Sequence, residues 1–116
     1  MTSGTDHGLV HLLELDGEVF QLDGGFWTKF DVRVVIPSPH IPHGIRYSLT
    51  LHDRQGTRLM GFDNAHAPPK PMKYAPRVVA WDHRHNREIV TSYRFESAGK
   101  LLEDFWKLVD RTVAGE

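Results

Sequence analysis

The feature that most constrains the fold is a regular alternation of apolar and polar residues in two segments of the chain. In residues 26–36 every second residue is apolar or aromatic except Thr28, as at Phe30 and Val32, and the charged residues Lys29, Asp31 and Arg33 alternate with them. Residues 46–53 repeat the pattern around Leu49. Because successive side chains of a strand point to opposite faces, a period of two predicts strands of a sheet that has one buried side.

Most of the remaining chain is also predicted to form strands joined by turns. Leu9–Leu15 is apolar and is followed by Asp16-Gly17, a dipeptide typical of two-residue hairpin turns. Further strands are expected at residues 18–22, 57–64, 78–81 and 89–95. Prolines interrupt strand pairing and predict loops before and after the 46–64 region. The pattern therefore indicates an antiparallel meander of about five to six strands.

The end of the chain is the only segment with the periodicity of a helix. From Leu101 to Val113, apolar residues recur at three- and four-residue spacing. Ser97 precedes them and can accept a hydrogen bond from a free amide of the first turn. Since neither a sheet nor a helix can bury its apolar side alone, the helix is expected to lie across one face of the sheet. The predicted fold is thus α+β: an antiparallel β-sheet meander packed by one C-terminal α-helix, in a single domain over residues 1–116 with a flexible N-terminus at 1–8.

Composition excludes several classes of protein. The 116 residues include no cysteine, which excludes a disulfide scaffold, a thiolate metal site and a cysteine nucleophile. The chain lacks both a signal-peptide pattern and an apolar run as long as a membrane span, so a cytoplasmic location without membrane contact is expected. The net charge of −1 does not indicate nucleic-acid binding, but residues 70–95 carry more basic than acidic residues. Such a stretch can attract phosphate, although an ordinary solvated face would show the same pattern.

The strongest local signal for chemistry is His83-Arg84-His85. On a strand, both imidazoles face one side and Arg84 faces the other. Two imidazoles on one face can bind a divalent metal, or they can act as a general acid and base near neutral pH. A metal site needs a third ligand, for which the candidates are His66, Asp63, His40 and His43. Two exposed histidines on a polar strand would give the same pattern, so these interpretations stay open.

A second polar cluster lies in the segment Phe62-Asp63-Asn64-Ala65-His66. Here a predicted strand ends in a carboxylate, an amide and an imidazole, immediately before a Pro-rich loop. Functional side chains often lie where loops leave strand ends, because the sheet fixes them while the loop admits a ligand. Asp and Asn also bond their own backbone in ordinary turns, so the cluster alone does not distinguish a site from a turn.

In their order along the chain, these features resemble the TumE family of toxins from bacterial toxin–antitoxin systems. The resemblance begins at Tyr47-Ser48-Leu49-Thr50-Leu51 and continues at residues 62–66, which are similar to a Tyr-Asp-Asn-Ala-type segment of that family. Asp82-His83-Arg84-His85 resembles the family's His-x-His element. Residues 93–95 and the following Leu101–Trp106 resemble its closing helix, and the whole likeness spans roughly residues 45–110.

The resemblance implies a growth-inhibiting type II toxin that is neutralised by a helix-turn-helix antitoxin encoded beside it. Because small toxins often act on RNA, it also implies an RNA substrate and a metal-independent, histidine-based endoribonuclease that uses no cofactor. Such cleavage needs a base for the 2′-hydroxyl proton and an acid for the leaving 5′-oxygen, and histidines with a pKa of about 6.5 meet both needs. The expected catalytic residues are His66, His83, His85 and Asp63. The expected substrate-binding residues are Asn64, Arg84 and Arg94.

Two alternatives from other classes stay open beside this hypothesis. One is a metal-dependent enzyme or metal-binding domain built on the same histidines. The other is a non-enzymatic interaction module whose sheet edge or basic strand binds a protein partner. Self-association into a homo-oligomer is compatible with all three hypotheses.

Overall fold

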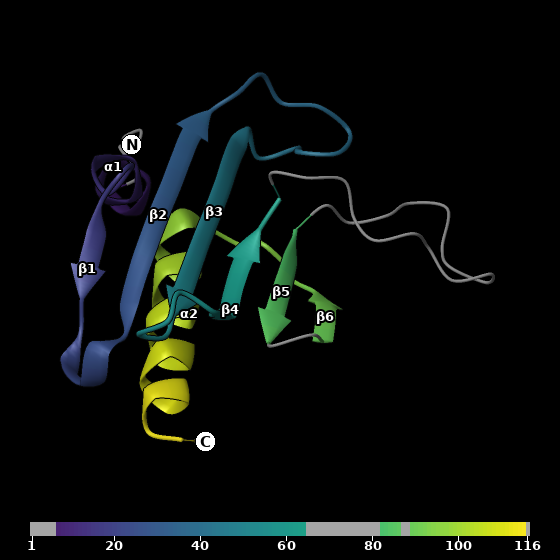
Figure 1. Ribbon diagram of the computed structural model, residues 1–116. Helices are drawn as coiled ribbons and strands as arrows, with labels where there is room; N and C mark the ends of the chain where they lie inside the picture. Colours follow the sequence, from purple (N-terminus) through teal and green to yellow (C-terminus); the bar gives the residue numbers. More distant parts are fainter. Residues whose placement is uncertain (1–6, 65–81, 87–88, 116) are drawn as a thin grey trace.

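Six strands follow one another across a single antiparallel sheet (Figure 1). The computed structural model describes residues 7–64, 82–86 and 89–115, and within these the order of strands in space equals their order in the chain. The strands are β1 (Val19–Gln21), β2 (Trp27–Val34), β3 (Ile45–His52), β4 (Arg58–Asp63), β5 (His83–Asn86) and β6 (Ile89–Ser92). The predicted antiparallel meander is therefore confirmed, with shorter strands than expected at β1 and β6. The strand predicted over residues 78–81 lies outside the described residues.

Burial in the sheet follows the alternation of the sequence. Phe30, Leu49 and Phe62 stand directly opposite one another on β2, β3 and β4, and all three are buried. Lys29 and Asp31, which flank Phe30 in the chain, are exposed on the other side. Cross-strand contact among large apolar side chains stabilises one face of the sheet, and the opposite face stays polar.

The C-terminal helix α2 (Ala98–Val113) covers the apolar face, as predicted. Its first turn is capped by the Ser97 hydroxyl, which accepts a hydrogen bond from the Lys100 amide at 3.1 Å. Phe105 packs edge-to-face on Phe30, with ring centroids 5.4 Å apart, and also contacts Phe62 at 6.2 Å. Aromatic pairs in this geometry add to the stabilisation from burial alone. The helix is therefore attached to the centre of the sheet.

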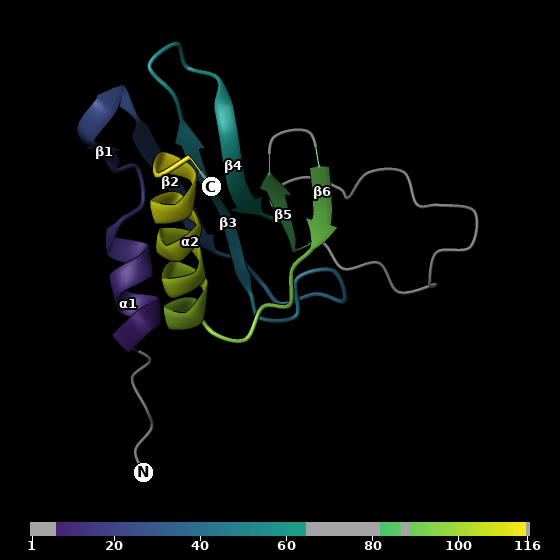
Figure 2. The ribbon, with the colours of Figure 1, turned by 90° about the horizontal axis from the view of Figure 1, so that it is seen from below.

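The prediction of a strand at residues 9–15 is wrong, because this segment lies in a second helix, α1 (His7–Glu14). Helix α1 packs beside α2 on the same side of the sheet (Figure 2). Leu9, Leu12 and Leu13 recur at helical spacing, and Leu12 is fully buried. A short apolar run suits a strand or a helix equally, so tertiary contact with α2 decides between them. The helix also begins inside the segment that was expected to be flexible.

The Asp16-Gly17 pair ends this helix region and does not turn a β-hairpin. Gly17 has a φ of +81°, in the left-handed region that glycine adopts without strain after a helix. The Asp16 carboxylate accepts a hydrogen bond from the Val32 amide at 2.8 Å and so attaches this connection to the edge of β2. Between β1 and β2 the chain forms a short 3-10 helix, η1 (Asp23–Gly25). Among the described helices, none is long and apolar enough to cross a membrane.

Replacing Leu12 and Val10 separately by alanine tests the helical assignment of the N-terminal segment. Leu12→Ala should lower the free energy of unfolding by about 2–5 kcal/mol, because Leu12 is fully buried. Val10→Ala should change it little, because Val10 is 44% exposed on the other side of the helix. In a strand the two residues would share one face. Equal losses in chemical denaturation would therefore contradict the helix.

Candidate functional site

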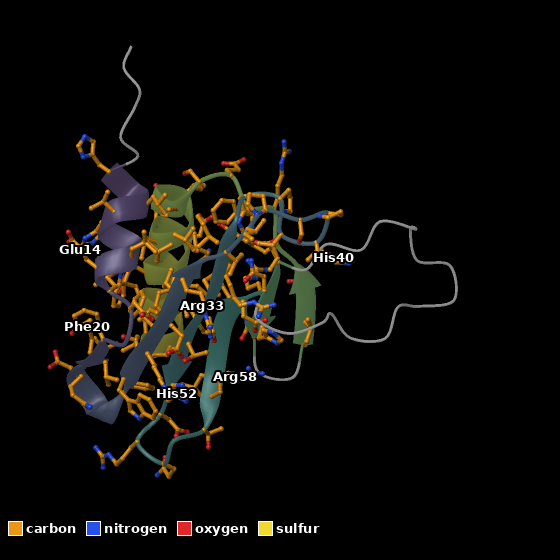
Figure 3. The ribbon with its side chains drawn as sticks, turned by 90° about the horizontal axis from the view of Figure 1, so that it is seen from above. Glu14, Phe20, Arg33, His40, His52 and Arg58 are labelled. Atoms are coloured by element: carbon orange, nitrogen blue, oxygen red, sulfur yellow. The ribbon has the colours of Figure 1, made fainter. Side chains whose placement is uncertain are left out.

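The face of the sheet that α1 and α2 leave uncovered carries the candidate site (Figure 3). Arg33, His52 and Arg58, labelled in this view, come from β2, β3 and β4. Most other side chains that alternate onto this face are also polar. We call it the open face.

At the centre of the site, His85 and Asp63 form a close pair on the open face. His85 Nε2 lies 2.8 Å from Asp63 Oδ2, and the two side chains are 13% and 10% exposed. Asp63 ends β4 and His85 lies in β5, where it stands opposite Gly61. A carboxylate only accepts hydrogen bonds, so Nε2 of His85 carries the proton that is shared with Asp63. The arrangement is that of an imidazole oriented by a carboxylate, which suits proton transfer near neutral pH.

Asn64 holds the end of β4 in place next to this pair. Its Oδ1 accepts a hydrogen bond from the Tyr47 amide at 2.8 Å, and its Nδ2 donates to the Ile45 carbonyl at 2.8 Å. The side chain thus extends the pairing of β4 with β3 beyond the last residue of the strand. Asn64 has no exposed surface. We therefore assign it a structural role in place of the expected contact with substrate.

Of the two arginines expected to bind substrate, Arg84 faces away from the pair. Arg84 points to the helix side of the sheet, where it lines a depression together with Phe62, Tyr93 and Lys100. The reason is the alternation of β5, which places neighbouring residues on opposite faces. We therefore assign Arg84 no contact with a ligand bound at His85. Arg94 is exposed just beyond β6, and its role in substrate binding stays a prediction.

The other two predicted catalytic histidines are only partly covered by the structure. The backbone of His83 pairs with Asp63 in the β4–β5 ladder, but its side chain lies outside the described part of the chain. His66 lies entirely outside the described residues. Of the predicted catalytic set, the structure therefore brings together His85 and Asp63.

A polar cluster around Asp82, which was not predicted from the sequence, joins three distant parts of the chain. We call it the Asp82 cluster. Asp82 Oδ2 accepts a hydrogen bond from the Tyr47 hydroxyl at 2.8 Å and lies 2.8 Å from His43 Nε2. The other ring nitrogen of His43 accepts from the Ile45 amide at 3.2 Å, and its ring stacks on Phe95 with centroids 3.8 Å apart. The side chains that contact Asp82 lie 35 and 39 residues before it in the sequence, so no local spacing pattern predicts these contacts.

The burial and pairing of its polar groups indicate that the Asp82 cluster stabilises the fold. Asp82 is buried, and each of the groups around it has a hydrogen-bond partner, which is the condition for burying a carboxylate. Burial and the adjacent Asp82 carboxylate raise the pKa of Tyr47, so that the phenol stays protonated and donates. His43 is bound within this cluster and is not a third ligand beside Asp63. Within residues 7–64, 82–86 and 89–115, no three His, Asp or Glu side chains are grouped to hold a metal ion.

Another imidazole, that of His52, lies at the far end of the open face. Its ring stacks on Trp27 with centroids 4.0 Å apart, and Nε2 lies 2.8 Å from the Thr50 hydroxyl. Partial burial, followed by the charges of Arg58 and Lys29, lowers the pKa of His52. The neutral ring is therefore the form that the fold favours.

Comparison with known proteins places the chain in a family. The family model described as toxin TumE matches residues 13–113. No curated protein and no solved structure matches the chain. Because the family model covers most of the sequence, the protein belongs to the TumE toxin family.

Removing the Asn64 side chain should destabilise the sheet. Asn64→Ala leaves a buried amide of Tyr47 and a buried carbonyl of Ile45 without partners, which should cost about 1–3 kcal/mol for each group left unpaired. Asn86→Ala is the matched control, because Asn86 is exposed in β5. Thermal unfolding of both variants measures the difference. Equal midpoints would mean that the Asn64 contacts do not stabilise the fold.

The stability of the protein should also depend on pH through His52. Because its pKa is lower in the folded state than the value of about 6.5 in an unfolded chain, its contribution is complete above that pH and is lost as the pH falls. His52→Gln removes this titration. Between pH 8 and pH 5 the wild type should therefore lose more free energy of unfolding than the variant. A larger loss in the variant would contradict the direction of the shift.

Proposed function

We propose that this TumE-family toxin is an endoribonuclease in which the Asp63–His85 pair performs the first proton transfer. The observation that carries the proposal is the 2.8 Å contact between His85 Nε2 and Asp63 Oδ2 on the open face of the sheet. A histidine held by a carboxylate has a defined tautomer and orientation, which a general base requires. The sheet fixes both residues, since they lie on adjacent hydrogen-bonded strands.

The proposed reaction uses the ribose 2′-hydroxyl of RNA as its nucleophile. His85 takes the proton of that hydroxyl, the 2′-oxygen attacks phosphorus, and the bond from phosphorus to the 5′-oxygen breaks to leave a 2′,3′-cyclic phosphate. A second histidine acts as the acid and gives its proton to the leaving 5′-oxygen. This acid is His66 or His83, the remaining histidines of the predicted site. Asp63 stabilises the imidazolium that forms on His85.

Charge on the open face supports an anionic substrate. Lys29, Arg33, Arg46 and Arg58 all alternate onto this face from β2, β3 and β4. Cationic side chains around a site raise the local concentration of a polyanion and lower the energy of charge that develops on phosphate. An RNA strand lying across the sheet would meet these groups and the Asp63–His85 pair on one surface.

The proposed partner is a helix-turn-helix antitoxin encoded beside the toxin, as in a type II system. Membership in a toxin family supports this assignment, because a cell that makes a toxin needs a means to neutralise it. A cytoplasmic location is part of the same proposal, because cellular RNA is the proposed substrate. A neighbouring reading frame for a small helix-turn-helix protein, and relief of growth inhibition on co-expression, would support the pairing.

The central test is RNA cleavage by the purified protein in the presence of EDTA. His85→Ala and Asp63→Asn should each lower the cleavage rate by about a hundredfold or more, because they remove the base and the group that orients it. His11→Ala is the control, since His11 is exposed on α1, away from the open face. The cleavage rate is followed with a labelled RNA, and growth inhibition in cells should fall in parallel.

Other results would favour the alternatives. RNA that stays intact under all conditions would exclude the ribonuclease. Cleavage that EDTA abolishes, with one equivalent of bound zinc or nickel by elemental analysis, would favour a metal-dependent enzyme. Growth inhibition that survives His85→Ala but is lost when basic residues are neutralised would favour a non-enzymatic interaction module.

A further inference from the structure

Two arginines on the open face stand directly opposite each other in the sheet. Arg33 of β2 and Arg46 of β3 are register partners in the antiparallel ladder. Neither guanidinium forms an ion pair or a hydrogen bond with any residue of the described structure. The Nε atom of Arg46 is buried, and no atom of the described residues accepts a hydrogen bond from it. Like charges directly opposite on a sheet, and a buried donor left unpaired, both destabilise the fold.

These arginines line a depression of about 440 Å³ on the open face, together with Ser48. Asp16 and Asp31 also line it, so two carboxylates lie in the same depression as the two guanidinium groups. Asp16 accepts the Val32 amide at 2.8 Å, and Asp31 lies 4.0 Å from the Lys29 ammonium. The guanidinium groups of Arg33 and Arg46 therefore have no acceptor among the described residues, although two carboxylates line the same depression. Charged donors in this state are available to an anion that binds from outside.

We propose that the Arg33–Arg46 depression binds a phosphate group of a nucleotide chain. Guanidinium groups match the geometry of phosphate oxygens and can bind them with two parallel hydrogen bonds. Ser48 adds a hydroxyl that can donate to the same group. A bound phosphate would relieve the repulsion between the two arginines and provide an acceptor for the buried Nε of Arg46.

The depression lies one strand away from the proposed catalytic pair. Ser48 is the register partner of Asp63 across β3 and β4, and Asp63 contacts His85. A phosphate held by Arg33 and Arg46 would thus belong to a nucleotide beside the one that is cleaved. This role as a substrate subsite rests on the proposed ribonuclease activity, whereas phosphate binding itself does not.

The first experiment measures binding of inorganic phosphate to the wild-type protein by NMR. Backbone amides of residues 33, 46 and 48 should shift as phosphate is added. In the Arg33→Gln/Arg46→Gln double variant, affinity should fall by about tenfold or more, because charge-assisted hydrogen bonds are lost. Arg111→Gln is the matched control, since Arg111 is exposed on α2. The double variant should also unfold at a temperature no lower than the wild type without phosphate, because the repulsion is gone.

The second experiment measures binding of a labelled single-stranded RNA in the His85→Ala background, where cleavage does not interfere. Each arginine replaced by glutamine should weaken binding and lower the slope of log affinity against log salt by about one. Arg111→Gln should leave both quantities unchanged.

The outcomes separate the two proposals. If phosphate binds at the arginine pair but wild-type protein never cleaves RNA, the subsite stands and the ribonuclease fails. If RNA is cleaved but phosphate binding is equal in the wild type and the double variant, the subsite is wrong. If a glutamate-rich peptide shifts these amides and phosphate does not, the depression is a contact for protein and the inference is overturned.

Discussion

The contact between Phe105 of α2 and the aromatic residues of the sheet decides how the whole molecule is organised. Phe30 and Phe62 meet this ring from β2 and β4, so the helix covers the middle of one face. Burial of apolar surface is the dominant favourable term in folding, and large aromatic side chains bury much of it for each residue. With α1 packed beside α2, the helices cover the apolar side of the sheet from β2 to β4, and β5 and β6 extend beyond them (Figure 2). The polar side is left uncovered by the helices, and Asp63 and His85 meet there.

Polar contacts at the ends of the strands complete what apolar packing cannot specify. Asn64 bridges two backbone groups of β3, and Asp82 joins Tyr47 to His43 just before β5. Both clusters adjoin the residues that carry the candidate chemistry, since Asn64 follows Asp63 in the chain. Buried networks in which every member has a partner make the surrounding structure rigid. The positions of His85 and its carboxylate partner Asp63 are thereby fixed by the fold itself.

The sheet and the C-terminal helix could be predicted because their signals are local. Alternation around Phe30 and the capping position of Ser97 depend on spacing alone, and both are confirmed. Helix α1 was missed because a short apolar run has no unique periodicity until it contacts another helix. Asp63 and His85 could be predicted as candidate site residues, because a strand-end carboxylate and a His-x-His motif are both visible in the sequence. The cluster at Asp82 could not be predicted, because it joins residues that only the folded topology brings together.

Because neighbouring residues of β5 face opposite sides of the sheet, the register of β5 against β4 must be strictly maintained. Arg84 faces the helices and His85 faces the open side, so adjacent residues of one four-residue strand belong to different layers of the molecule. A slip of a single position against β4 would exchange the two side chains and put a guanidinium where the imidazole now meets Asp63. Whether the protein possesses a histidine–carboxylate pair at all is thus settled by the alignment of a very short ladder. A substitution elsewhere in the protein that shifts this register would therefore break the contact between His85 and Asp63 without changing either residue.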